Sequence, residues 1–295
     1  MNVFHSNITL NTNHTYLILG ANGQLGKQFA KDLTIGNKTV IAPDEKDCDI
    51  TSVDTLSRFI DSVKPTVIIN CAAYNAVDLA EQQTDTAYLI NTTAVNTIAT
   101  LCNEKNIFFV HYSSDYVFDG SKGNLYTEND TPNPLNVYGK SKRAGEEAVF
   151  SSGGKYLLFR TSWVFGNGAQ NFIHKILQWS QNNSVLKLTA DEVSVPTSTI
   201  DLVDITLQSI NKGLTGLYHL TNSDYASRYE WGRYIAKQLS LHSTIIPVPM
   251  SAFPSSAQRP LFSAMSNQLL QNDLGITIPD WRDAVDRFLV EYPIQ

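Results

Sequence analysis

Tyr138 and Lys142 stand four residues apart in the segment Tyr-Gly-Lys-Ser-Lys. If residues 138–150 form a helix, the two side chains lie on one face, separated by one turn. A phenol with a pKa of about 10 is a poor acid–base group at neutral pH, but a nearby ammonium favours the phenolate and lowers that pKa. The spacing therefore predicts that Tyr138 donates a proton to a carbonyl oxygen while a hydride reaches the carbon.

Ser114 is the third residue that fits this chemistry. Ser113 and Ser114 end a β-rich run that begins at residue 107. Ligands of open α/β sheets bind at the carboxyl ends of the strands, so a serine hydroxyl there can hold the same carbonyl oxygen. A tyrosine and a lysine at this spacing are common by chance. Their occurrence after a glycine-rich turn and a serine, in the required order, favours a catalytic set of Ser114, Tyr138 and Lys142.

A glycine-rich turn follows the apolar run 16–19 and precedes a helix-compatible stretch at 24–33. The first glycine of such a turn permits tight bending, the second lets backbone approach a pyrophosphate, and the third lets the helix pack closely on the strand. The N-terminus of the helix offers free N–H groups and a partial positive charge to the phosphates. The turn alone could be structural, but its context predicts a dinucleotide site made by Gly20, Asn22, Gly23, Gln24, Leu25 and Gly26.

Further residues complete the predicted dinucleotide site. Asp44 follows the run 39–42, where a carboxylate can bond the ribose hydroxyls and favours NADH over NADPH. A solvated turn acid is the alternative for Asp44. Asp49 and Ile50 fit a loop that touches adenine, and Ala72 and Ala73 leave room for a cofactor close to the backbone. Because Asp44 only favours NADH, the predicted cofactor is NADH or NADPH.

The elements that must position these residues alternate between strand and helix. Short apolar runs suit strands that are buried on both faces, and helix-compatible stretches between them imply parallel crossovers. The runs lie at 16–19, 39–42, 66–70, 107–112, 155–160 and 216–221, and the helical stretches between the first four at 24–33, 52–63 and 84–104. The sequence therefore predicts an α/β fold with a Rossmann-like doubly wound parallel sheet and a smaller C-terminal α/β substrate lobe.

The domain boundaries follow from this pattern. We expect residues 1–14 to be a loose polar leader and residues 15–165 to form the dinucleotide-binding domain. Segments near 200–222 are expected to return to that domain, while residues 166–295 form mainly the substrate lobe.

The composition excludes several other classes of protein. The chain has 295 residues, a mean hydropathy of −0.16 and a net charge of −6. No apolar run approaches the roughly 18 residues that a spanning helix needs, and an acidic chain without a basic tract is a poor candidate for binding nucleic acid. Three cysteines without a Cys-x-x-Cys pair indicate a reducing compartment. We therefore expect a cytoplasmic protein that binds neither membranes nor nucleic acid.

The sequence resembles the extended short-chain dehydrogenase/reductase family and, within it, the dTDP-4-dehydrorhamnose reductase branch. The resemblance covers nearly the whole chain after residue 15 and is carried by GANGQLG (20–26), INCAAYNAVDLAE (69–81), HYSSDYVFDG (111–120), PLNVYGKSKRAGEE (134–147), RTSWVFG (160–166), GLYHLTNS (216–223) and QRP (258–260). It implies an NAD(P)H-dependent enzyme, acting as a monomer or homodimer. The implied reaction reduces the C4 ketone of a nucleotide-linked 4-keto-6-deoxyhexose, with dTDP-4-dehydro-L-rhamnose as the first candidate.

The resemblance also assigns roles. It implies that Lys142 bonds the nicotinamide ribose as well as assisting Tyr138, and it assigns Tyr112 and Tyr138 to the cofactor site. Asn91 matches the helix asparagine that supports the catalytic site in many relatives. The alternative is that Asn91 is an ordinary polar residue of a helix. The residues implied to surround the deoxysugar are Val77, Ser114, Asp115, Tyr116 and Trp163.

The assignments of Arg259, Tyr112 and Trp163 each have an alternative. Arg259 is a candidate for the nucleotide diphosphate, because a guanidinium matches phosphate oxygens, and a surface ion pair is the alternative. Aromatic side chains at strand ends usually belong to the core, which is the alternative for Tyr112 and Trp163.

Several positions depart from related sequences. Sugar-nucleotide dehydratases have Thr-Asp-Glu where this chain has residues 114–116, Ser-Asp-Tyr, which disfavours dehydration. The segment 191–197 reads Asp-Glu-Val-Ser-Val-Pro-Thr instead of Asp-Gln-x-Gly-x-Pro-Thr, and the segment 259–265 lacks a second arginine. Gln28 stands where some members use a glutamate for a magnesium cluster, so no metal site is predicted.

Two other functions remain open. The regulatory subunit of methionine adenosyltransferase resembles this branch and works mainly by binding a partner, so a non-catalytic subunit is the rival from another class. A 4-keto reductase for a different deoxysugar would keep the chemistry and change the substrate.

Overall fold

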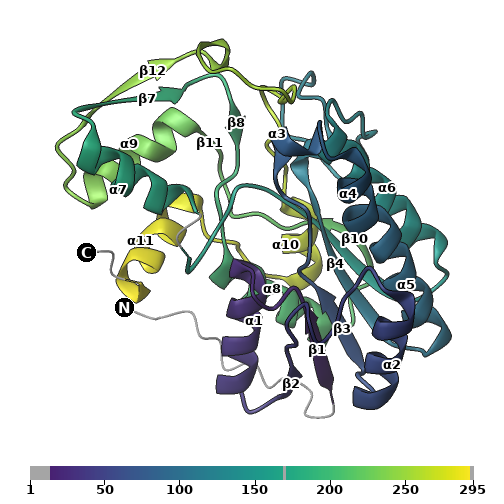
Figure 1. The fold of residues 1–295 in the computed structure, drawn as a ribbon. Coiled ribbons are helices and arrows are strands. Elements are labelled where there is room, and N and C mark those ends of the chain that lie inside the picture. The colour runs from purple at the N-terminus through teal and green to yellow at the C-terminus, as the bar shows by residue number, and fades with distance from the viewer. Residues whose placement is uncertain (1–13, 169–170, 293–295) are drawn as a thin grey trace.

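Six parallel strands, in the order β2-β1-β3-β4-β5-β10, form the central sheet of the larger lobe of the molecule (Figure 1). The computed structural model describes residues 14–168 and 171–292, so the predicted leader lies outside the described residues except for His14. In sheet order the strands are Thr39–Ile41, Thr15–Leu19, Val67–Asn70, Phe108–Ser114, Tyr156–Thr161 and Gly216–His219. The order reverses between β1 and β3, which opens a crevice at the carboxyl ends of these two strands.

Helices cover both faces of the sheet (Figure 1). Alternate side chains of β1 enter two different cores, Tyr16 and Ile18 on one face and Leu17 and Leu19 on the other. Such strands are apolar on both faces, which is why they appear in the sequence as continuous runs. The first face packs against α1 (Gln24–Ile35), α8 (Thr199–Lys212) and α10 (Gln268–Leu274), and the second against α2 (Val53–Val63), α5 (Ala94–Glu104) and α6 (Val137–Ser151). This confirms the predicted Rossmann-like fold.

A second, smaller lobe has its own core. Trp231, Trp281, Phe165 and Phe288 are buried there among the helices and short strands of the C-terminal half. These elements are β6 (Val164–Phe165), α7 (Phe172–Asn182), β7 (Val185–Thr189), β8 (Val193–Ser194), β9 (Thr197–Ser198), β11 (Ala226–Ser227), α9 (Arg228–Gln238), β12 (Thr244–Val248), η3 (Met250–Ala252) and α11 (Trp281–Glu291). Within residues 14–168 and 171–292, none of the helices combines the length and apolar composition that crossing a bilayer would require.

The chain passes back to the sheet after the second lobe has begun. Helix α8 and strand β10 lie within the segment near 200–222 and pack against or pair with the central sheet. Helix α10 also contributes to that core through Leu270, although it belongs to the segment 166–295.

Short helical segments follow strands β3 and β4 in the chain. They are α3 (Val77–Ala80), α4 (Thr84–Tyr88), the π-helical turn η1 (Leu89–Thr93) and η2 (Asp115–Val117). Asn91 in η1 is buried, and its amide bonds the backbone N–H of Tyr74 at 2.9 Å, the carbonyl of Tyr74 at 3.1 Å and the Ser141 hydroxyl at 3.0 Å. Asn91 thus ties the loop after β3 to α6.

Helix α6 lies unusually close to its neighbours because two of its residues are glycines. A Cβ on Gly139 would lie 2.2 Å from the Tyr116 carbonyl oxygen, and one on Gly145 would lie 2.2 Å from that of Asn91. The Asn136 side chain caps the helix by accepting a hydrogen bond from the Gly139 N–H at 2.8 Å. The Asn136 cap therefore sets where α6 begins, and the two glycines allow the helix to pack against the backbone of Tyr116 and Asn91.

A buried ion pair attaches α6 to β5. Two hydrogen bonds of 2.7 Å join the Arg160 guanidinium to the Glu146 carboxylate, and these side chains are 1% and 0% exposed. Burial acts to raise the pKa of Glu146, but Arg160, together with weaker contributions from Ser113 and Arg143, holds the pKa below its usual value. Arg143, which is partly exposed, contacts the same carboxylate at 3.0 Å.

Replacing Arg160 by Met should leave Glu146 charged, buried and short of its main partner. We expect a loss of about 3–5 kcal/mol in the free energy of unfolding, measured by urea denaturation. Arg143→Met is the matched control, because it removes a partly exposed partner of the same carboxylate and should cost less than about 1 kcal/mol. Equal losses for the two variants would contradict the role assigned to the buried pair.

Candidate functional site

The three glycines of the first turn have different roles. Gly20 has a φ of +75°, and a Cβ there would lie 2.5 Å from the Ala72 nitrogen. A Cβ on Gly26 would lie 2.3 Å from the Gly20 carbonyl oxygen, so this glycine allows α1 to pack on the turn. The nearest atom to a Cβ on Gly23 is 3.4 Å away. Gly20 and Gly26 are thus required by the fold, whereas Gly23 leaves space that the protein itself does not fill.

That space belongs to two adjoining cavities along the carboxyl edge of the sheet. The first cavity, of about 460 Å³, extends from Gly23 past Tyr138 to Trp163, and the second cavity, of about 350 Å³, extends from Gly23 to Asp44. The predicted cofactor residues that line the second cavity are Gly20, Asn22, Gly23, Asp44, Asp49, Ile50, Ala72 and Ala73. Gln24, Leu25, Tyr112, Tyr138 and Lys142 line the first. Gly26 lines neither and acts through packing.

The carboxylates of the second cavity also stabilise their own turns. Asp44 accepts hydrogen bonds from the backbone N–H groups of Lys46 and Asp47 at 2.8 and 3.0 Å. Asp49 accepts from Thr51, and these hydrogen bonds lower the pKa of Asp49. Asp44 is therefore a turn residue that also lines the cavity, and its bonding to the ribose hydroxyls stays a prediction.

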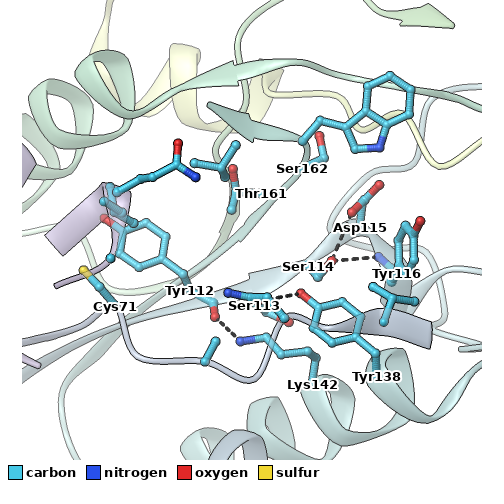
Figure 2. Close-up of a pocket in the computed structure, with 18 of the residues that line it drawn as sticks. Cys71, Tyr112, Ser113, Ser114, Asp115, Tyr116, Tyr138, Lys142, Thr161 and Ser162 are labelled. Carbon is cyan, nitrogen blue, oxygen red and sulfur yellow. Dashed lines mark hydrogen bonds between the residues drawn. The ribbon is translucent and has the colours of Figure 1, made fainter. Parts of the chain in front are cut away.

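The predicted catalytic residues converge on the first cavity, Ser114 from the end of β4 and Tyr138 and Lys142 from α6 (Figure 2). Lys142 Nζ donates a hydrogen bond of 2.6 Å to the Tyr112 carbonyl. Ser114 Oγ donates to Asp115 at 3.0 Å, and the Tyr138 hydroxyl donates to Asn75 Oδ1 at 3.4 Å. The three groups thus surround one space that adjoins the glycine turn.

Burial controls the protonation of these groups. It raises the pKa of Tyr138 to about 12, and a hydrogen bond with Ser114 acts in the opposite direction. It lowers the pKa of Lys142 to about 8, against the charge of Glu146. The net shift on Tyr138 is therefore opposite to the lowering expected from the sequence, because loss of water outweighs the neighbouring groups. Tyr138 is a neutral phenol at neutral pH, the form that can donate a proton.

The residues assigned to the sugar lie at the other side of the first cavity. Val77, Ser114, Asp115, Tyr116 and Trp163 all line it. Asp115 is buried, which raises its pKa, and it accepts hydrogen bonds from the hydroxyls of Ser114, Ser194 and Ser263. The Tyr116 hydroxyl donates to Glu192 at 3.4 Å. Ser194 and Glu192 lie in the altered segment 191–197, so this segment bonds directly to the cavity wall.

Arg259 is not among the residues that line the two cavities. Its guanidinium donates to both carboxylate oxygens of Asp78, at 3.1 and 2.5 Å. It also donates to Ser255 and lowers the pKa of Asp78 well below its usual range. The structure therefore places Arg259 in the ion pair that was the alternative interpretation of this residue.

Several residues of the first cavity were not identified from the sequence. Asn75 lies within the segment 69–81 that carries the family resemblance, so its position could have indicated it. Arg228 and Lys175 carried no motif and reach the cavity only because the second lobe folds against the sheet. The others are Asn70, Cys71, Ser113, Thr161, Ser162 and Val164.

The residues around the glycine turn fit a dinucleotide. Gly23 and the small side chains of Ala72 and Ala73 leave room beside the N-terminus of α1, which suits a pyrophosphate. Among the described residues, no three His, Cys, Asp or Glu side chains gather where they could hold a metal ion. Gln28 is buried and bonds to Asp32 and Tyr292.

Comparison with known proteins gives consistent results. A family model described as the RmlD substrate binding domain matches residues 14–294. The dTDP-4-dehydrorhamnose reductase of Burkholderia thailandensis is 38% identical over 288 residues, which cover 91% of this chain and 96% of that protein. A crystal structure of dTDP-4-dehydrorhamnose reductase from Bacillus anthracis in complex with NADP superimposes with a TM-score of 0.91 at 33% identity, covering 94% of this chain and 99% of that one. A structure of the same-named protein from Clostridium acetobutylicum gives a TM-score of 0.92 at 35% identity and covers 95% of this chain and 100% of that one.

Two glycine substitutions should separate the binding role of the turn from its structural role. Gly23→Ala should fold normally, because its nearest neighbour is 3.4 Å away, but its methyl group occupies the cavity. We expect NADH affinity to fall at least about tenfold in a fluorescence titration. Gly26→Ala should instead lose about 1–3 kcal/mol of stability in urea denaturation, because its methyl group meets backbone. Normal NADH affinity in Gly23→Ala would contradict the assignment.

Proposed function

Since the chain belongs to the dTDP-4-dehydrorhamnose reductase branch of the extended short-chain dehydrogenase/reductase family, we propose that it reduces the C4 ketone of a nucleotide-linked 4-keto-6-deoxyhexose with NADH or NADPH. The proposed substrate is dTDP-4-dehydro-L-rhamnose and the product dTDP-L-rhamnose. The observation that carries the proposal is the convergence of Ser114, Tyr138 and Lys142 on one cavity that adjoins the glycine turn.

The three residues have complementary roles in the proposed reaction. The reduced nicotinamide, when bound, supplies the hydride that C4 receives. Tyr138, protonated because it is buried, donates its proton to the ketone oxygen, so the ketone becomes an alcohol and the tyrosine becomes a phenolate. The Ser114 hydroxyl, which donates to Asp115 in the structure, is proposed to turn to the ketone oxygen, donate a hydrogen bond there and stabilise the negative charge that develops.

Lys142 is proposed to act after Tyr138 has given up its proton. Its ammonium lies one helical turn from Tyr138 and stabilises the phenolate that the proton transfer leaves behind. In the structure it donates to the Tyr112 carbonyl, and this donor group is the one proposed to bond the nicotinamide ribose. The sequence predicted that the Lys142 ammonium lowers the pKa of Tyr138. We propose that this charge acts instead on the phenolate, after Tyr138 has given up its proton.

The sugar is proposed to lie between Val77, Asp115, Tyr116 and Trp163, which line the cavity beside Ser114. The complete set of Ser114, Tyr138 and Lys142 favours an enzyme over a non-catalytic regulatory subunit. We further propose a cytoplasmic monomer or homodimer that acts on a small molecule and not on nucleic acid or a membrane. A different 4-keto deoxysugar remains the second candidate substrate, and NMR of the product would distinguish it.

Replacing Tyr138 by Phe removes the proton donor and keeps the ring. We expect turnover to fall about 100- to 10,000-fold, while NADH affinity changes less than about twofold. The assay follows NADH absorbance with a 4-keto sugar nucleotide as substrate. Tyr156→Phe is the matched control, since Tyr156 begins β5 and does not line either cavity. Near-normal turnover of Tyr138→Phe would contradict the proposed reaction and favour the regulatory subunit.

The pKa values imply a decline in activity at alkaline pH. As the pH rises through about 8, Lys142 loses its charge, while Tyr138, with a pKa of about 12, keeps its proton. We expect kcat/KM for the sugar nucleotide to fall above a single apparent pKa near 8. In Lys142→Arg, where the charge persists, this decline should disappear from that pH range even though the maximal rate is lower. An unchanged alkaline limb in Lys142→Arg would contradict the assignment.

A further inference from the structure

Arg228 is a cation of the first cavity to which the proposed mechanism assigns no role. It is the first residue of α9, and its guanidinium lies over the Trp163 ring, 3.6 Å from the centroid, and 5.1 Å from the centroid of Phe172. Trp163 itself has a φ of +41°, which is rare for a bulky residue, and it stacks on Trp231 with a centroid distance of 5.8 Å. The aromatic rings thus form a rigid platform for Arg228.

The hydrogen-bonding capacity of Arg228 is largely unused. Its one ion-pair contact is from Nε to Glu192 Oε2 at 3.8 Å, which is too long for a hydrogen bond. Among the described residues, its side chain donates no hydrogen bond, and 24% of it is exposed. A guanidinium carries five N–H donors in a planar fork that matches phosphate oxygens. These donors are free to bond a group that occupies the cavity which Arg228 lines.

The surrounding charges favour an anion at this position. Lys175 also lines the first cavity, and its side chain makes neither a hydrogen bond nor an ion pair with any described residue. The one carboxylate among the described residues of the cavity wall is that of Asp115, and three serine hydroxyls already donate to it. Glu192, whose carboxylate lies 3.8 Å from Arg228 Nε, does not line this cavity.

Arg259, the other arginine considered for the diphosphate, differs in each of these respects. Both oxygens of Asp78 accept from its guanidinium, as do Ser255 and the carbonyl of Ala257. Binding a phosphate would require breaking these interactions, whereas Arg228 offers free donors.

We propose that Arg228 binds the diphosphate of the nucleotide sugar, at the phosphate next to the sugar, with Trp163 as its platform. The inference rests on the proposed function, which places the sugar beside Trp163. Because the diphosphate is attached directly to the anomeric carbon, a cation stacked on a residue that contacts the sugar is within reach of the first phosphate. Glu192 offsets the charge of Arg228 and weakens the binding that it provides.

The test compares two nucleotides that differ by this phosphate. dTDP and dTMP are titrated by calorimetry into the NADH-saturated protein and its Arg228→Gln variant. We expect Arg228→Gln to weaken dTDP about 10- to 100-fold, and dTMP less than about threefold. A role limited to holding Trp163 would weaken both nucleotides equally, and that result would overturn the inference.

Two further variants sharpen the test. Arg233→Gln, on the same helix but exposed and outside the cavity, removes the same charge and should leave both affinities within about twofold. Glu192→Gln removes the opposing carboxylate with little change in shape and should bind dTDP about two- to fivefold more tightly. Equal losses in Arg228→Gln and Arg233→Gln, or weaker dTDP binding by Glu192→Gln, would overturn the inference.

Activity and dTDP binding of the wild-type protein show whether the inference or the proposed function has failed. If it reduces the 4-keto sugar nucleotide and Arg228→Gln still binds dTDP as tightly, only the role of Arg228 is overturned. Loss of dTDP affinity in Arg259→Gln with no loss in Arg228→Gln would likewise overturn it in favour of Arg259. If the wild type neither binds dTDP nor reduces the substrate, the proposed function fails and the inference fails with it.

Discussion

The Glu146 carboxylate and the Arg160 guanidinium meet inside the molecule with almost no contact with water. Arg160 donates two hydrogen bonds to Glu146, which accepts one more from the partly exposed Arg143. The helix that carries Glu146 therefore cannot slide or rotate on β5 without leaving a buried charge short of its main partner. That helix, α6, also carries Tyr138 and Lys142. The same constraint therefore positions the side chains that are proposed to react and keeps the glycines at 139 and 145 against their neighbours.

The charge that matters for function is local. The chain is acidic, with a net charge of −6, although its proposed cofactor and substrate are anions. The described wall of the first cavity nevertheless contains Lys142, Lys175 and Arg228. Its single carboxylate, on Asp115, is occupied by serine hydroxyls. Net charge is a sum over the whole surface, so it indicates little about a site formed by a few groups of opposite sign.

Features that depend on short stretches of sequence could be predicted. Buried strands appeared as apolar runs, the glycine turn as a fixed spacing, and the Tyr138–Lys142 pair as one helical turn. The pKa of Tyr138 could not be predicted in the same way, because burial raises it and burial depends on the packing of distant elements. The same holds for Arg259, whose partner Asp78 lies 181 residues away in the sequence.

The sequence by itself therefore determined the fold class, the order of the elements and which residues are proposed to react. These follow from hydrophobic periodicity, from backbone freedom at glycine and from the pitch of a helix, all of which act over a few residues. Tertiary structure decided the protonation state of those groups and which arginine faces the cavity. Both depend on the water and the charges that remain around a side chain after the second lobe has packed against the sheet.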